Sequence, residues 1–245
     1  MSDGRQELAR RLELAREPNP DDARGPHWRL LLGELAVLLE PILRLFRRIA
    51  VPAAAHPRTV MILPGFATHP VRMRYLAKHL ERAGHTAKRW GLGFNFGPTP
   101  EKLAALEQRL LDLHQLHGEK IVLVGWSLGG LFARELAWRH PDAVAKVITM
   151  GSPFSGNPRA NNVWRIYQFI AGHRVESPPV EVHSSGKPPV ETVALWSPRD
   201  GMIAPRCAAG YEHERDRAIA LRCSHIGFSY APESIQTILQ ELDRP

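Results

Sequence analysis

The chain has 245 residues, of which 44% are hydrophobic and 23% are charged. This composition predicts one folded domain of α/β size and excludes wholesale disorder. Lysine and arginine exceed aspartate and glutamate by 32 − 25 = 7 charges, but no run of five or more basic residues occurs in the sequence. We therefore interpret the basic excess as a solvated surface and expect no nucleic-acid partner.

Cysteine content and the N-terminal sequence bear on the cellular compartment. Two cysteines, Cys207 and Cys223, exclude a disulfide-rich scaffold and a zinc site made of cysteines alone. The first residues are charged where a secretory signal needs an apolar core, and the apolar stretch 30–49 is interrupted by charged residues. We therefore expect free thiols, with one bridge between the two cysteines as the alternative. We also expect a soluble, cytoplasmic protein, with peripheral membrane contact as the alternative.

Two segments precede the main domain. Residues 1–26 are polar and end in NPDDARGP, which predicts a poorly anchored helix followed by a flexible linker. Residues 27–58 form an amphipathic helical segment that Pro41 interrupts. Its apolar residues at helical spacing are Leu31, Leu35, Leu38, Leu39, Ile42, Leu45, Phe46 and Ile49. The segment either packs on the main domain or, with Arg44, Arg47 and Arg48 at its end, docks on lipid or covers a pocket.

Strand and helix patterns alternate over residues 59–245. We expect strands at 59–63, 86–90, 120–124, 145–150, 192–196 and 218–223, and helices at 71–83, 100–117, 128–139 and 233–242. Gly84 and Gly118 are placed to end two of these helices, and Thr99 is placed as an N-cap. The pattern predicts an α/β fold with a doubly wound, mostly parallel six-stranded sheet and helices on both faces. Residues 152–189 interrupt the alternation with one expected helix, 161–171, and predict a cap over a site.

One motif carries most of the chemical information. The apolar run 121–124 leads into Gly125-Trp126-Ser127-Leu128-Gly129 and directly into a helix. A serine on such a strand–helix turn has a strained backbone, and glycines flank it because side chains there would clash with neighbouring elements. Its hydroxyl lies at a helix N-terminus, where the helix dipole favours developing negative charge. We therefore predict that Ser127 is a nucleophile; a glycine-rich packing turn is the alternative interpretation.

A serine nucleophile needs a base, and the base needs an orienting acid. Asp200 follows the strand expected at 192–196, and His225 follows the strand expected at 218–223. The carboxyl ends of parallel strands share one edge of the sheet, so these residues are expected to meet Ser127 there. The other candidate acids, Asp112, Asp142 and Asp216, do not end a predicted strand. A partly buried loop histidine is the alternative interpretation of His225.

Backbone N–H groups are expected to complete the site. The N–H of Leu128, directly after the nucleophile, is one oxyanion donor, and the loop after the first strand brings a second, the N–H of Phe66. Trp126, Phe154, Trp164 and Tyr167 are candidate substrate contacts, although core packing explains the aromatic residues of the insertion equally well. The pair His114 and His117 lacks an acidic partner nearby, so we expect no metal and no organic cofactor.

From Thr59 to its end, the sequence resembles the α/β-hydrolase superfamily on its lipase and esterase side, chiefly through GWSLGG. The resemblance implies Ser127 as nucleophile, His225 as base and acid, Asp200 as orienting carboxylate, and Phe66 with Leu128 as oxyanion donors. Two features depart from the family pattern. Pro64 stands where relatives often carry histidine, and the usual first two strands are replaced by the segment 30–49, which predicts a trimmed six-stranded sheet.

The functional expectation is a serine hydrolase that cleaves carboxylic esters through an acyl-enzyme. Its substrate is expected to be a small ester, and the apolar insertion and N-terminal segment favour a hydrophobic acyl chain. The same residues also suit a thioesterase or an acyltransferase. A catalytically silent binding protein with the hydrolase fold, associated with membranes through its N-terminal segment, is the alternative from another class.

Overall fold

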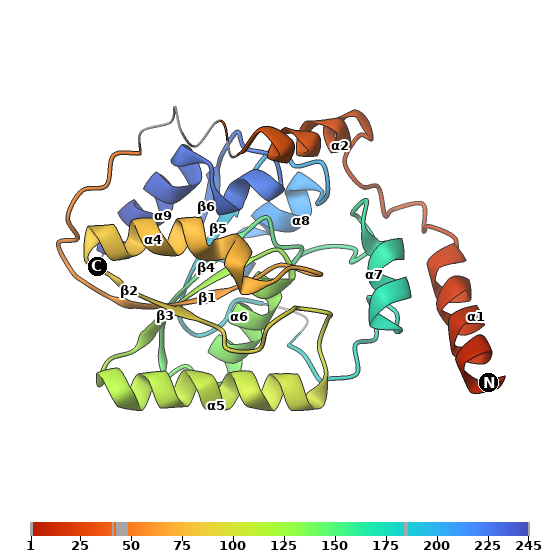
Figure 1. Ribbon diagram of the computed structural model, residues 1–245, viewed down its shortest axis with the longest axis horizontal. Helices are drawn as coiled ribbons and strands as arrows, with labels where there is room; N and C mark the ends of the chain where they lie inside the picture. The colour runs from red at the N-terminus through yellow and green to blue at the C-terminus, as the bar shows by residue number, and fades with distance from the viewer. Residues whose placement is uncertain (1, 41, 43–48, 184–185, 245) are drawn as a thin grey trace.

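In the computed structural model, which describes residues 2–40, 42, 49–183 and 186–244, a parallel sheet forms the centre of the protein (Figure 1). Its strands are β1 (Thr59–Leu63), β2 (Thr86–Arg89), β3 (Ile121–Trp126), β4 (Val144–Met150), β5 (Glu191–Trp196) and β6 (Arg217–Ala220). Their order across the sheet is β2-β1-β3-β4-β5-β6, and every neighbouring pair is parallel. The predicted fold class is confirmed.

The helices fall close to the predicted ranges. They are α1 (Ser2–Arg16), α2 (Arg29–Glu34), α4 (Arg74–Ala83), α5 (Pro100–His117), α6 (Leu128–Arg139), α7 (Trp164–Ala171), α8 (Pro205–Ala209) and α9 (Pro232–Asp243). Shorter 3-10 turns are η1 (Leu35–Leu39), η2 (Pro70–Met73), η3 (Glu212–Glu214) and η4 (Ile226–Ser229). The expected caps are present: the Thr99 side chain accepts from the N–H of Lys102, and Gly84 and Gly118 have φ of 102° and 64°. The five-residue α8 was not predicted, because it is too short to show a helical period.

Apolar side chains cover both faces of the sheet. Figure 1 shows α4 and α9 on one face and α5 and α6 on the other. Along β1, Val60 and Ile62 pack into the cluster under α4 and α9, whereas Met61 and Leu63 pack into the cluster under α5 and α6. All five residues of β1 are buried, so this strand is a continuous apolar run rather than an alternating one.

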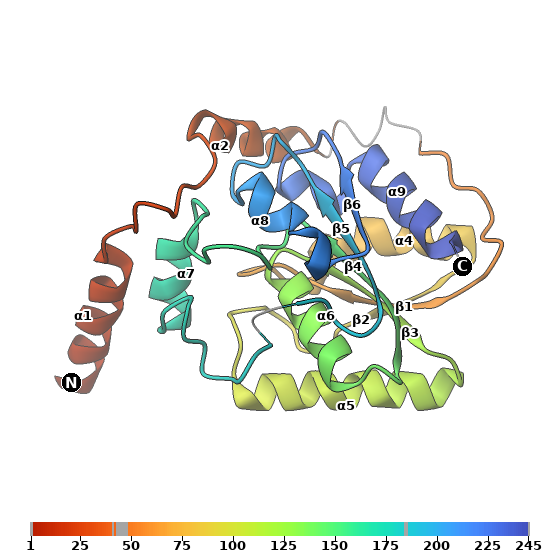
Figure 2. The ribbon, with the colours of Figure 1, turned by 180° about the vertical axis from the view of Figure 1, so that it is seen from behind.

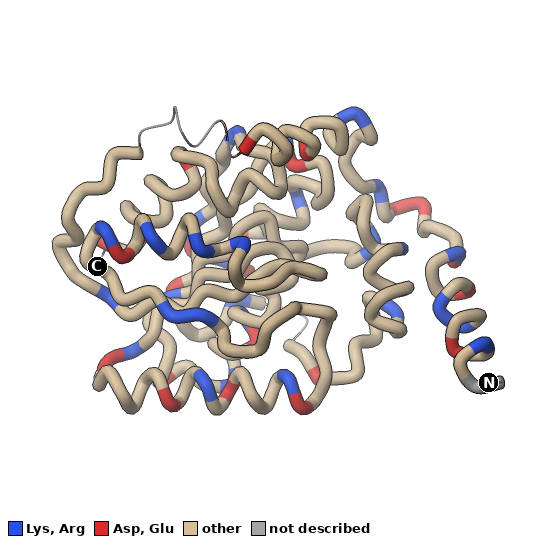
Figure 3. The backbone as a smooth tube through the Cα atoms, viewed as in Figure 1, with Lys and Arg blue, Asp and Glu red and all other residues tan. Residues whose placement is uncertain are grey.

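The first helix is anchored on the cap, which the sequence did not predict. Figure 2 shows α1 beside α7 at one end of the molecule, and Figure 3 shows basic and acidic residues interleaved along α1. Arg10 and Arg11 donate to the carbonyl groups of Gly172 (2.8 Å) and Ile170 (2.6 Å) at the end of α7. The arginines we took as solvated therefore satisfy carbonyls that a helix C-terminus leaves unpaired.

The N-terminal segment packs on the domain chiefly through two acids, and Ile49 is the described member of its apolar stripe that joins the core. Glu34 and Glu40 are buried, whereas Leu35, Leu38 and Leu39 are exposed. Glu40 lies 2.6 Å from Arg72 of η2, and the partners of Glu34 are described below. A buried carboxylate requires such partners, and here they determine which face of the segment turns inward. The predicted positions Leu45 and Phe46, and the basic cluster at 44–48, lie outside the described residues.

Two expectations about the whole chain can be compared with the structure. Cys207 and Cys223 are both buried and unbridged, so the prediction of free thiols is confirmed. Burial raises the pKa of both thiols. Within the described part of the chain, no helix combines the length and apolar character that crossing a membrane requires.

The close packing of β1 against the start of α6 yields a stability prediction. A Cβ added to Gly129 would lie 2.3 Å from the carbonyl oxygen of Leu63, so Gly129→Ala should force the backbone apart and destabilise the fold by about 1–3 kcal/mol. Gly4→Ala is the matched control, because a Cβ at this position in α1 would contact nothing within 4 Å. Urea unfolding of the two variants measures the difference, and equal stability would contradict the packing described here.

Candidate active site

Ser127 occupies the turn between β3 and α6 in an unusual backbone conformation. Its φ is 52° and its ψ is −122°, a region that residues with a side chain rarely adopt. The glycines around it allow three backbones to meet. A Cβ on Gly125 would lie 2.4 Å from the carbonyl oxygen of Gly129, and a Cβ on Gly130 would lie 2.0 Å from Ser152 Oγ. The steric role predicted for these glycines is confirmed.

The Ser127 side chain is half-buried, and its hydroxyl has no hydrogen-bond partner within the described part of the chain. The residue sits directly before α6, with its side chain at the positive end of the helix dipole. The hydroxyl is therefore not held by another described group, and a helix N-terminus favours negative charge beside it.

Asp200 and His225 form a buried pair at the carboxyl ends of neighbouring strands. His225 Nδ1 donates to Asp200 Oδ2 at 2.7 Å, and both side chains are at most 3% exposed. The other oxygen, Oδ1, accepts from the N–H groups of Met202 and Ile203 at 2.8 Å each. A carboxylate is an acceptor only, so the shared proton is assigned to Nδ1, which leaves Nε2 of the neutral ring as a base.

The electrostatic surroundings keep His225 basic. Burial alone lowers the pKa of an imidazole, but the adjacent Asp200 carboxylate, together with Glu34, outweighs this effect. The pKa of His225 is therefore raised above its ordinary value.

Trp126 connects the serine turn to the histidine loop. Its indole Nε1 donates to the carbonyl of His225 at 3.0 Å, and the two rings lie 5.6 Å apart. Gly151, directly after β4, packs against the imidazole of His225, because a Cβ there would lie 3.0 Å from His225 Nδ1. Trp126 is only 4% exposed, so the structure places it beneath the site as a brace and not among the substrate contacts that we expected.

The loop after β1 lies against Ser127. A Cβ on Gly65 would be 3.3 Å from Ser127 Cβ, and the N–H of Phe66 follows directly. Neither this N–H nor that of Leu128 has a hydrogen-bond partner among the described residues. Asn95 fixes the loop, because its side chain donates to the carbonyl of Pro64 at 2.8 Å and its own carbonyl accepts from the N–H of Ala67 at 2.7 Å. Sequence reasoning missed Asn95, whose only signal was one amide side chain in a glycine-rich loop.

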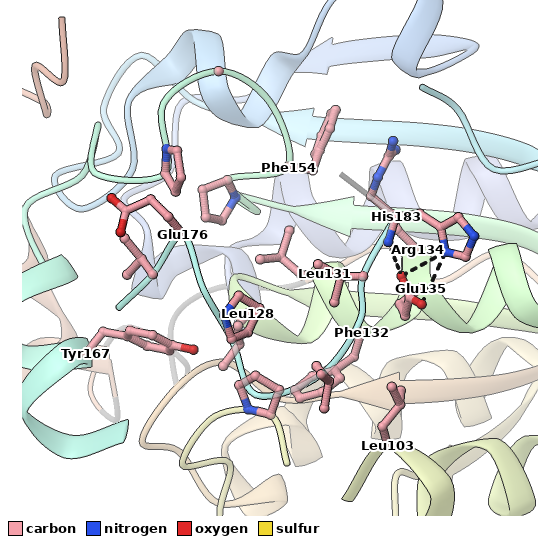
Figure 4. Close-up of a pocket in the computed structure, with 18 of the residues that line it drawn as sticks. Leu103, Leu128, Leu131, Phe132, Arg134, Glu135, Phe154, Tyr167, Glu176 and His183 are labelled. Carbon is pink, nitrogen blue, oxygen red and sulfur yellow. Dashed lines mark hydrogen bonds and ion pairs between the residues drawn. The ribbon is translucent and has the colours of Figure 1, made fainter. Parts of the chain in front are cut away.

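A cavity of about 330 Å³ opens at Leu128, directly after Ser127, between α6 and the cap (Figure 4). Its apolar lining includes Leu103, Leu128, Leu131, Phe132, Phe154, Tyr167, Val175, Val180 and Val182. Phe154 and Tyr167 are therefore placed where the sequence suggested, and the Tyr167 ring lies 4.8 Å from that of Phe66. Trp164 is not part of the lining; it is buried between the guanidinium groups of Arg159 and Arg165.

One buried cation borders this cavity. Arg134 of α6 donates to the carbonyl groups of Glu214 (3.0 Å) and Gly186 (2.7 Å), and its guanidinium lies 4.2 Å from the centre of the Phe154 ring. Burial lowers the pKa of Arg134 to about 10. Because its donors are turned toward carbonyl groups, Arg134 holds the cap against the domain. Glu135, Glu176 and His183 also line the cavity, so its wall is part apolar and part charged.

Known proteins share this architecture. A Bacillus licheniformis lipase in its mature form superposes with a TM-score of 0.60 and 14% identity, over 80% of this chain and 97% of that chain. A naproxen esterase from Bacillus subtilis superposes with a TM-score of 0.51 and 14% identity, over 79% and 86%. The family model described as alpha/beta hydrolase fold matches residues 58–169. The chain therefore has the α/β-hydrolase fold.

Two curated proteins resemble parts of this α/β-hydrolase in sequence. Homoserine O-acetyltransferase from Thermus thermophilus is 30% identical over 129 residues, which are 52% of this chain and 31% of that protein. Pimeloyl-[acyl-carrier protein] methyl ester esterase from Edwardsiella ictaluri is 42% identical over 62 residues, which are 25% of this chain and 23% of that protein. The chain thus spans less than a third of the length of either of these relatives.

The backbone strain at Ser127 in this α/β-hydrolase leads to a prediction with an unusual sign. Replacing alanine by glycine ordinarily destabilises a fold. At position 127, strain on the order of 1–3 kcal/mol is relieved only by glycine, so Ser127→Gly should be about 1 kcal/mol more stable than Ser127→Ala. Denaturant unfolding of the two variants measures the difference. A Ser127→Ala protein at least as stable as Ser127→Gly would show that the turn is unstrained.

Proposed function

We propose that this α/β-hydrolase is a serine hydrolase that cleaves carboxylic esters. The observations that carry the proposal are the buried Asp200–His225 hydrogen bond and a strained serine at a helix N-terminus, which the neighbouring Trp126 connects to the histidine loop. Support also comes from the structural neighbours, which are a lipase and esterases. A strained serine without a hydrogen-bond partner among the described residues costs stability, so its occurrence in a chain that also carries an oriented imidazole favours a catalytic role.

In the proposed reaction, Ser127 Oγ attacks the ester carbonyl while His225 Nε2 takes its proton. The negative charge that develops on the carbonyl oxygen is met by the N–H groups of Phe66 and Leu128. Collapse of this intermediate expels the alcohol, which receives the proton from His225, and leaves an acyl group on Ser127. Water deprotonated by His225 then releases the acid. Asp200 holds the ring in the required tautomer throughout and stabilises its protonated form.

We propose a hydrophobic acyl chain as the substrate's acid portion. The cavity borders Leu128, whose N–H is one of the proposed oxyanion donors. An acyl carbonyl held at this donor therefore has apolar walls from α6 and the cap within reach of its chain. Tyr167 and Phe154 narrow the space from the cap side, so we assign substrate contact to these two aromatic residues.

Acyl transfer is the second candidate, favoured by the similarity to homoserine O-acetyltransferase. The same acyl-enzyme would then pass its acyl group to an alcohol instead of water. The two outcomes separate in one measurement, because added alcohol either captures the acyl group as a new ester or leaves the free acid as the product. If a new ester forms in preference to the free acid, acyl transfer replaces hydrolysis as the proposed function.

Labelling and turnover test the catalytic residues together. A fluorophosphonate probe should modify the wild-type protein at Ser127, and Ser127→Ala should abolish the labelling. Ser127→Ala and His225→Ala should each lower the turnover of p-nitrophenyl esters by several orders of magnitude. The double variant should be little worse than either, because the groups act as a unit. A well-folded wild-type protein that resists the probe would favour a binding protein without turnover.

The cavity gives a prediction about chain length. Leu131→Trp should fill space between α6 and the cap. This change should lower kcat/KM for p-nitrophenyl decanoate by roughly 10-fold or more and leave kcat/KM for p-nitrophenyl acetate nearly unchanged. Leu116→Trp is the matched control, because Leu116 is 73% exposed on α5, outside the cavity lining. An equal loss of kcat/KM for p-nitrophenyl acetate and p-nitrophenyl decanoate would show that the cavity does not bind the acyl chain.

A further inference from the structure

The carboxylate of Glu34, at the end of α2, lies beneath the loops that carry Asp200 and His225. Its Oε1 accepts from the N–H of His225 at 2.7 Å and from the N–H of Gly201 at 2.9 Å. Its Oε2 accepts from the N–H of Ile226 at 2.9 Å. Glu34 is only 4% exposed. One buried carboxylate therefore receives three backbone hydrogen bonds from two loops that are separated by more than twenty residues of sequence.

The backbone of the Asp200 loop is shaped to receive α2. A Cβ on Gly201 would lie 2.5 Å from the carbonyl carbon and oxygen of Leu30, so only glycine permits this approach. Asn162 of the cap adds a second link, since its side chain donates to the carbonyl groups of Pro26 (3.0 Å) and Gly201 (2.8 Å). The contact of α2 with the Asp200 loop is thus fixed by backbone packing as well as by the Glu34 carboxylate.

We propose that Glu34 is a positioning residue for catalysis, which acts by holding the His225 loop and the Asp200 loop in a fixed relation through one carboxylate. The inference rests on the proposed hydrolase function. Hydrogen bonds to a charged acceptor are stronger than those between neutral groups, and both loops are anchored beside the residues that must stay aligned. A loss of this anchor lets the imidazole move relative to Ser127, and a misplacement of about 1 Å can lower the rate on the order of 100-fold.

Glu34 also acts on the proton affinity of the base. The charged groups that act on His225 are Asp200, at 2.7 Å from Nδ1, and Glu34, which binds the backbone N–H of the same residue. The rings of Trp126 and Phe228 are its nearest aromatic neighbours. Both carboxylates stabilise the protonated imidazole and raise its pKa. Removing the charge of Glu34 therefore lowers the pKa of His225, and the acid limb of the pH profile moves to lower pH.

Glu34→Gln tests this role, because the amide keeps one acceptor oxygen but removes the charge. Glu40→Gln is the matched control: it removes the other buried carboxylate of the same segment, which pairs with Arg72 and not with the histidine loop. The imidazole titration of His225 is followed by NMR in a Ser127→Ala background, with the resonance assigned by its absence in His225→Gln. Circular dichroism and thermal unfolding verify that each variant is folded.

We expect the His225 titration to move down by several tenths of a pH unit in Glu34→Gln and to stay in place in Glu40→Gln. In the otherwise wild-type protein, Glu34→Gln should slow fluorophosphonate labelling, and the acid limb of kcat/KM should shift by the same amount as the titration. An unshifted titration with an unchanged labelling rate would overturn the inference. Wild-type protein that the probe does not label would instead overturn the proposed hydrolase, and the NMR titration still tests the Glu34 contact in that case.

Discussion

A carboxylate that is almost fully removed from water is stable only when its oxygen atoms are satisfied by donors. Asp200 meets this condition with one side-chain donor, His225 Nδ1, and two backbone donors that follow it in its own loop. These contacts fix the direction of the imidazole, and the loop that carries it is fixed in turn by the indole of Trp126. The orientation of the base therefore depends on a chain of contacts that begins at one buried acid.

The sheet places the residues of the candidate site at one of its edges. Because β3, β5 and β6 are parallel, the residues that follow them emerge at one edge, although they are far apart in the sequence. The loop after β1 joins the same edge, since Gly65 packs against Ser127. Close approach of β1, β3 and α6 is possible only because glycines stand at the contact points. The same packing that allows the site also leaves the serine in a strained conformation.

The parts of the structure that local patterns specify were predictable from the sequence. Continuous apolar runs such as 59–63 indicated buried parallel strands, and Thr99 and Gly118 marked the ends of α5. The positions of Ser127, Asp200 and His225 after three different strands of a parallel sheet indicated one shared edge. Contacts between polar groups distant in sequence were not predictable. Periodicity treats Glu34 and Glu40 as the solvated side of a helix, yet their partners are a backbone and an arginine more than thirty residues away. The sequence could not distinguish the buried Trp126 and Trp164 from Phe154 and Tyr167, which line the cavity. Aromatic residues suit a core and the wall of a cavity equally well.

The contact of the histidine loop with α2 changes where the N-terminal boundary of the candidate site is drawn. The family model begins at residue 58, and β1, the first strand, begins at Thr59. A shortened version that starts there would retain the whole sheet and all the strand-borne residues of the site. It would nevertheless expose three amide groups that no other described residue satisfies, beneath the loop that must hold the base still. The sheet and the contacts that satisfy the histidine loop therefore require different lengths of chain.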